Sequence, residues 1–145
     1  MTMPSKSWII LIVTVLFASA CWAQGLESGN LIGIHVVTVT LNPGVTMDQF
    51  KNAFVHDVLP EYEKNWPGLK GYLLKGFFDE HKDRFAIVWL FKTVADRNRN
   101  FDANGRANEL ERAALEKVKP FEDKLKKTYG SYTVKYTNED DWVVQ

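Results

Sequence analysis

Residues 68–91 read GLKGYLLKGFFDEHKDRFAIVWLF, and this stretch decides the fold. Two aliphatic and aromatic runs flank the short, charged segment Asp79–Asp83. The pattern predicts a β-hairpin whose loop lies at that segment. A hairpin alone cannot bury its apolar side chains, so we expect the helical segments before and after it to cover one of its faces.

Residues 1–23 have the pattern of an export signal. Lys6 precedes an apolar run at residues 8–17, and small residues follow that run. The run is shorter than the roughly 20 residues that cross a bilayer, so we expect no membrane span. The sequence therefore predicts bacterial export, to the periplasm or out of the cell.

Two processing routes are open. Signal peptidase I would cleave after Ala23 and leave Gln24 as the first residue. Alternatively, residues 18–21 resemble a lipobox, and Cys21 would then be lipidated and anchor the protein. Ala18 stands where lipoproteins usually carry leucine, which favours simple cleavage. By either route the only cysteine is removed or modified, so we expect no disulfide.

The remaining chain divides into a polar tether at residues 24–30 and one domain at residues 31–145. The composition is that of an ordinary globular domain, with 46% hydrophobic residues. The 18 basic and 18 acidic side chains balance, and this balance argues against a nucleic-acid partner.

Besides the first strand of the hairpin, three segments have the patterns of β-strands, and one of them is the second strand of the hairpin. Leu31–Leu41 is rich in β-branched residues at both odd and even positions, and Phe85–Phe91 is apolar at both. Such strands lie in the middle of a sheet that is covered on both faces. Ser131–Thr137 alternates apolar and polar residues, which indicates a half-exposed strand.

Helical periodicity appears between these strands. Thr46 and Gln49 form a capping box that starts a helix extending to residue 66, and Pro60 should kink or split that helix near Leu59. A short helix is expected at Val94–Phe101 and a long one at residues 108–129.

The order β-α-β-β-α-β predicts an α+β, ferredoxin-like split βαβ fold with a four-stranded antiparallel sheet in the order 4-1-3-2. Right-handed crossovers place both long helices on one face of that sheet. The order makes the first and third strands central, and these are the two strands that are apolar on both sides. The second apolar face then needs a cover, and a second copy of the chain is the simplest one, so we expect a homodimer through the sheet face.

Residues 31–136 resemble the dimeric α+β barrel superfamily, which includes antibiotic-biosynthesis-type monooxygenases and NIPSNAP-like proteins. The resemblance is one of pattern and lies in the strand that carries His35, in Asp57–Pro60 within its helix, in Pro67–Gly71, and in Ala86–Trp89 before a short helix. It implies sheets paired across a two-fold axis and a ligand held between sheet and helices.

His35 is the histidine most suited to a site, because it lies in a central strand on the same side as Val37 and Val39. A neutral imidazole there can orient a substrate, act as a base or bind haem iron. The alternative is a hydrogen-bonded histidine of the core. His56 should face solvent and His81 lies in the predicted loop, so no metal site is expected.

Aromatic residues predict a pocket around His35. The candidates are Trp89, Tyr72, Tyr62, Phe54 and Trp66. The alternative is that these rings are ordinary core residues.

A cluster of arginines, Arg97, Arg99 and Arg106, either receives a carboxylate or phosphate or forms a solvated face.

These features support three functions. The first is binding of a small apolar or aromatic molecule, with no cofactor. The second is a cofactor-independent, monooxygenase-like enzyme that acts on an aromatic substrate through His35, Trp89 and Tyr72. The third is haem binding through His35. The short helix after Trp89 lacks the histidine and tryptophan that the resemblance would require for haem degradation.

Overall fold

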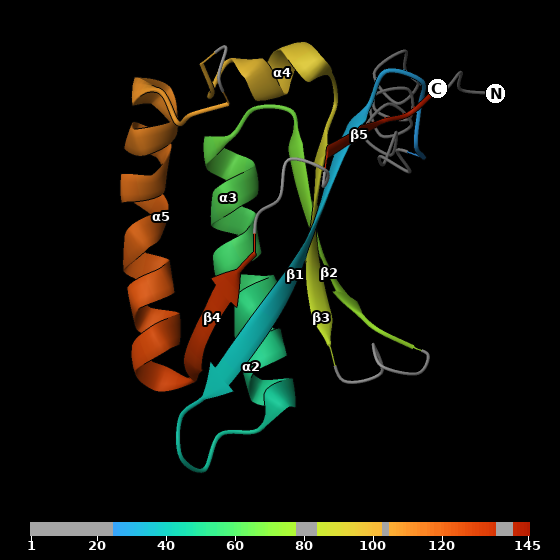
Figure 1. Cartoon of the computed structure of the whole chain (residues 1–145). Helices are drawn as coiled ribbons and strands as arrows, with labels where there is room; N and C mark the ends of the chain where they lie inside the picture. Colours follow the sequence, from blue (N-terminus) through green and yellow to red (C-terminus); the bar gives the residue numbers. More distant parts are fainter. Residues whose placement is uncertain (1–24, 78–83, 103–104, 136–140) are drawn as a thin grey trace, which may run out of the picture.

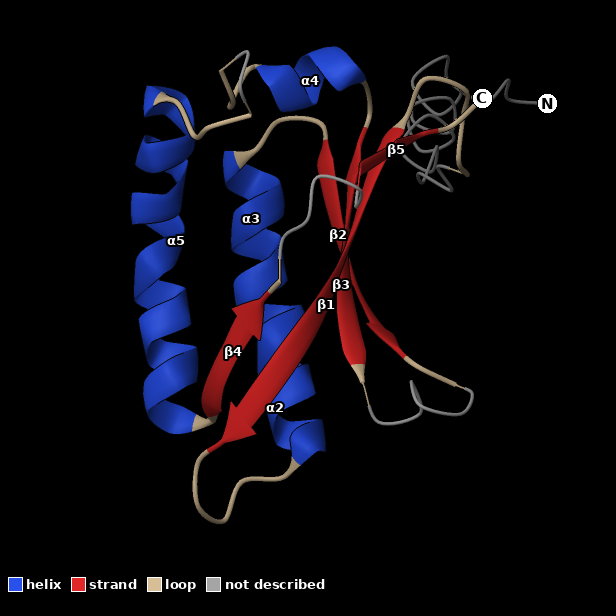
Figure 2. Cartoon of the chain, viewed as in Figure 1, coloured by secondary structure: helices blue, strands red, loops and turns tan. Residues whose placement is uncertain are grey.

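The computed structural model describes residues 25–77, 84–102, 105–135 and 141–145 of the chain. Its elements follow the predicted order of strand, helix, two strands, helix and strand, with further short elements between them (Figures 1 and 2). In chain order they are β1 (Leu31–Leu41), α2 (Met47–Ala53), the π-helical segment η1 (Phe54–Val58), α3 (Leu59–Asn65), β2 (Leu69–Lys75), β3 (Phe85–Phe91), α4 (Val94–Asn98), α5 (Glu109–Thr128), β4 (Gly130–Val134) and β5 (Asp141–Val143).

The main sheet has the strand order β2-β3-β1-β4, and every neighbouring pair is antiparallel. The predicted α+β fold and strand order are therefore confirmed. The sequence pattern does not predict β5, which pairs with Leu31–Gly33 of β1. Leu31 also pairs with Phe91 of β3, so β5 lies on the other edge of β1, the edge that β4 joins further along.

The helices α2, α3 and α5 lie on one face of the sheet, and the opposite face carries no helix among the described residues (Figure 1). In β1 the side chains at Leu31, His35 and Val37 point toward the helices and are buried. The alternate residues Ile34 and Val36 point to the opposite face and are exposed. Side chains alternate across a strand, so this burial pattern fixes which residues can meet the helices.

The predicted capping box at the start of α2 is present. The Thr46 hydroxyl accepts from the Gln49 N–H at 3.3 Å, and the Gln49 side chain accepts from the Thr46 N–H at 2.9 Å. The predicted break near Pro60 is also present, as the π-helical segment η1. There the Leu59 N–H donates to the carbonyl oxygen of Phe54, one residue beyond the α-helical partner. Pro60 has no N–H to donate, so the α-helical ladder is interrupted at this point.

The helix α5 is continuous from Glu109 to Thr128, with Asn108 as its N-cap. It joins β4 through Gly130, whose φ of +144° is in a region that side chains disfavour. A Cβ atom at Gly130 would overlap the Thr40 carbonyl oxygen of the neighbouring strand β1. Glycine is thus required for α5 to turn directly into the edge of the sheet.

Several predictions fall on residues outside the described ranges. The export signal at residues 1–23, the fate of Cys21 and the hairpin loop with His81 are among them, and they stay predictions. The strand predicted at residues 131–137 ends at Val134, and residues 136 and 137 are also outside the described ranges. Within the described part of the chain, no helix has the length and apolar character needed to cross a membrane.

Candidate functional site

A cavity of about 440 Å³ lies on the helix-covered side of the sheet. It is bounded by β1, β2 and β3, by α3 and α4, by the first turns of α5 and by β5. Its lining residues are His35, Tyr62, Trp66, Leu69, Trp89, Phe91, Arg97, Phe101, Gly105, Glu111, Leu115 and Asp141.

Four of the six predicted site residues meet in this cavity: His35, Tyr62, Trp66 and Trp89. The other two do not line it. Phe54 is fully buried in the core, where its ring stacks on Phe50 and makes a T-shaped contact with Tyr132. Tyr72 pairs with Val88 in the β-ladder, not with Trp89, so it projects from the opposite face of the sheet and is exposed. One subunit therefore does not bring Tyr72 together with His35.

Two glycines make room for the cavity's floor. Trp89 of β3 lies in register with Gly33 of β1 on one side and with Gly71 of β2 on the other. A Cβ atom at Gly71 would lie 2.9 Å from Cζ3 of Trp89. A Cβ atom at Gly33 would lie 2.9 Å from both Nε2 of His35 and Oδ1 of Asp141. The indole, the imidazole and the carboxylate thus occupy space that larger residues would fill.

The ring of Tyr62, on α3, forms part of the cavity wall. Its ring centroid lies 5.1 Å from that of Trp66 and 4.9 Å from that of Trp89. Its hydroxyl donates a 2.5 Å hydrogen bond to Oε1 of Glu122, which also accepts from Tyr132 at 2.7 Å. Burial, followed by the nearby Tyr132 and Glu122, raises the pKa of Tyr62, so its phenol stays neutral.

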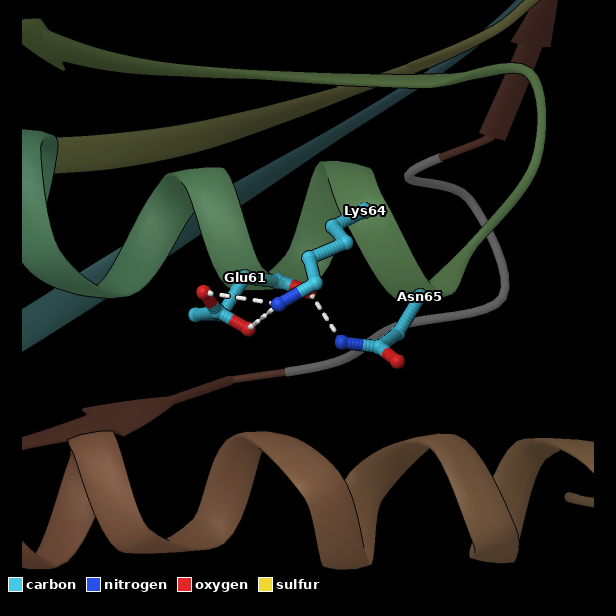
Figure 3. Close-up of polar contacts among 3 residues, drawn as sticks. All are labelled: Glu61, Lys64 and Asn65. Atoms are coloured by element: carbon cyan, nitrogen blue, oxygen red, sulfur yellow. Dashed lines mark hydrogen bonds and ion pairs between the residues drawn. The ribbon is translucent and has the colours of Figure 1, made fainter.

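The last turn of α3 positions Trp66, the second aromatic residue of the cavity wall. Asn65 Nδ2 donates a 2.8 Å hydrogen bond to the carbonyl oxygen of Glu61, and Lys64 pairs with the Glu61 carboxylate at 3.2 Å (Figure 3). These contacts stabilise the last helical turn. Trp66 follows directly, and its indole is buried against the core.

The indole of Trp66 is hydrogen-bonded to a buried carboxylate, that of Glu111. Its Nε1–H donates to Oε2 of Glu111 in the first turn of α5, while the Glu111 backbone N–H donates to Oδ1 of the N-cap Asn108 at 3.1 Å. Glu111 is only 8% exposed. Burial raises the pKa of the Glu111 carboxyl, and this effect outweighs the hydrogen bond from Trp66 and the positive charge of Arg97, which both lower it.

Arg97, on α4, contributes a positive charge to the cavity lining. Its Nη2 pairs with Oδ2 of Asp141 at 3.4 Å, and its guanidinium lies 4.3 Å from the centre of the Phe101 ring. The predicted arginine cluster is therefore divided. Arg99 pairs with Asp96 at 3.3 Å, and only Arg97 of the three arginines lines the cavity.

The sequence pattern does not place Glu111 or Asp141 in the site, and it gives Arg97 only as one of three arginines that receive a carboxylate or phosphate or form a solvated face. These three charged residues come from α5, β5 and α4, which are far apart in the chain. The only signal that the sequence holds for Glu111 is its spacing, since it stands three residues before Ala114 and seven before Val118 on the apolar face of the helix. Within the described ranges, no group of three or more histidine, cysteine, aspartate or glutamate side chains is placed to hold a metal ion.

Comparison with known proteins gives no match: no family model, no curated protein and no solved structure is significantly similar to this chain. What is shown is an α+β fold with a four-stranded antiparallel sheet. The cavity itself is therefore the basis on which a function can be proposed.

Proposed function

We propose that this protein binds a small, mainly apolar aromatic molecule in the cavity between the sheet and the helices. The observation that carries the proposal is a space of about 440 Å³ walled by the aromatic rings of five residues: Tyr62, Trp66, Trp89, Phe91 and Phe101. Ligand sites in proteins have volumes of roughly 300–1,000 Å³, with apolar walls and a few polar groups. The polar groups here are His35, Arg97, Glu111 and Asp141.

The geometry favours a flat ligand. Tyr62 lies within ring-contact distance of both Trp66 and Trp89, and the partly buried rings of Tyr62 and Trp89 present an aromatic surface to the cavity, whereas Trp66 is buried behind them. A planar molecule can stack on such a surface and displace water from it, which is favourable in proportion to the apolar area removed from water.

Methylnaphthalene, a bicyclic aromatic without polar groups, is a suitable first probe. It should give saturable shifts of the Trp66 and Trp89 indole N–H resonances in NMR spectra. Leu115→Trp would place a large ring in the lining, and it should weaken binding at least about tenfold because the ring and the ligand compete for the same space.

Leu110→Trp is the matched control. Leu110 lies on the same helix, is 63% exposed and is not part of the lining. It should leave the affinity unchanged. Absence of saturable binding to the unmodified protein, or equal weakening by both variants, would rule out this cavity as the binding site.

Two further parts of the proposal concern the whole protein. The exposed apolar face of the sheet supports a homodimer of the kind found in the dimeric α+β barrel superfamily, and membership of that superfamily is itself part of the proposal.

Export is supported by the sequence of residues 1–23. The N-terminal residue of protein recovered outside the cytoplasm would test it, with Gln24 expected for simple cleavage and lipidated Cys21 for the alternative.

A further inference from the structure

Beside the imidazole of His35, the cavity lining holds one guanidinium and two carboxylates. The guanidinium of Arg97 is already paired with Asp141 and lies over the Phe101 ring. Because the charges of Arg97 and Asp141 cancel, the Glu111 carboxylate gives the lining one net negative charge. A ligand that carried a carboxylate or phosphate would meet this excess charge at close range.

Glu111 has hydrogen-bonding capacity that the protein does not use. Its Oε2 accepts the indole N–H of Trp66. Among the residues that the structure describes, none donates a hydrogen bond to its Oε1. Glu111 is only 8% exposed as a residue and lines the cavity, and its Oε1 is open to a donor on a molecule bound there. A buried carboxylate gains most from a donor that carries a positive charge.

The rings beside Glu111 favour the same kind of ligand. Trp66 lies next to the carboxylate, and the ring of Tyr62 stacks on Trp66. Aromatic faces attract ammonium groups, and the attraction grows when water is excluded. Glu111 is thus an acceptor in a cavity that also holds the partly buried rings of Tyr62 and Trp89, which suits an amine attached to a flat, apolar body.

We propose that the cavity selects an aromatic molecule bearing a primary amine, whose ammonium group binds the Glu111 carboxylate while its ring packs against the partly buried rings of Tyr62 and Trp89. This inference rests on the proposed ligand-binding function and names the chemical class of the ligand. The raised pKa of Glu111 agrees with it, because that shift reflects the loss of solvation that an ammonium group would replace.

Three probes of similar shape separate the inference from the function on which it rests: naphthylmethylamine, methylnaphthalene and naphthoate. Near neutral pH, the amine should bind about tenfold more tightly than methylnaphthalene, and naphthoate should bind most weakly. If none of the three binds, both the function and the inference are wrong. If methylnaphthalene binds and the amine binds no more tightly, only the inference is wrong.

Glu111→Gln tests the role of the carboxylate. Glutamine keeps a side-chain oxygen that can accept from Trp66, but it has no charge. The ratio of amine to methylnaphthalene affinity should fall to about one in this variant. Glu116→Gln removes the same charge from an exposed position of the same helix, and it should keep the tenfold ratio. A ratio that is unchanged in Glu111→Gln, or lost equally in Glu116→Gln, would overturn the assignment.

Discussion

Glu111 is a residue at which stability and binding have opposite requirements. Its carboxylate is buried, and burial disfavours the charged form. The groups that face it are the indole N–H of Trp66 and the guanidinium of Arg97, and both favour the charged form. The net effect raises its pKa, so the ionised side chain reduces the stability of the empty protein.

A pH dependence of stability follows from this shift. The folded-state pKa lies above the unfolded value of about 4.5. The contribution of Glu111 to the free energy of unfolding is therefore fully present below the unfolded pKa and is lost as pH rises through the folded pKa. Urea unfolding from about pH 4 to neutrality should show Glu111→Gln gaining stability relative to the unmodified protein as pH rises. A difference that stays constant with pH would contradict the shift.

The residues of the site differ in how far the sequence predicts them. The positions of His35, Trp66 and Trp89 are predictable, because the apolar periodicity of the segment around each residue places its side chain toward the core. Tyr72 is not, because composition alone suggests it and the register Tyr72↔Val88 sends its ring to the other face. Asp141 enters the site only because β5 pairs with β1, and a strand of three residues leaves no periodic signal.

At the level of elements, the sequence predicts those features that depend on interactions between residues close together in the chain. The capping box of Thr46 and Gln49 and the interruption before Pro60 depend only on near neighbours, and both are confirmed. The connection from α5 to β4 depends instead on a contact with Thr40 of β1, which is distant in the chain. Gly130 therefore gains its importance from tertiary structure.

Gly130→Ala should destabilise the protein by about 2–3 kcal/mol. Its φ of +144° strains any residue with a Cβ atom, and that atom would overlap the Thr40 carbonyl oxygen. Chemical denaturation measures the change. Gly25→Ala serves as the control, because a Cβ atom there meets nothing within 4 Å, and it should change stability by less than about 0.5 kcal/mol. Equal effects of the two substitutions would show that the connection tolerates a side chain.

At the level of the whole molecule, the strand order is predictable because two strands are apolar at both odd and even positions. Only a central place in the sheet suits such strands, and the order β2-β3-β1-β4 provides it for β1 and β3. The cavity is not predictable in the same way, since it depends on where α3, α4, α5 and β5 leave space between their side chains. Pattern determines which face a residue occupies, whereas a cavity depends on how completely that face is filled.

The face of the sheet without helices leads to the last prediction. Its side chains Ile34, Val36, Tyr72 and Leu74 are 43–47% exposed, and Trp142 pairs with Ile32 of β1 beside them. An apolar surface of this kind is suited to pair with itself, because a two-fold axis places the same patch on both partners. Light scattering at micromolar concentration should give the mass of a dimer.

Ile34→Lys should convert that dimer to a monomer. The two-fold axis places the charge twice in one interface, beside the apolar side chains Val36, Tyr72 and Leu74. Leu110→Lys places the same charge at an apolar residue on α5 that is 63% exposed and is not on the sheet, so it should leave the dimer intact. A monomer mass for the unmodified protein would refute self-association, and a dimer mass for Ile34→Lys would place the contact elsewhere. Because Ile34 and His35 point to opposite faces of β1, methylnaphthalene should still bind the monomeric variant, which would separate the two surfaces of this sheet by function.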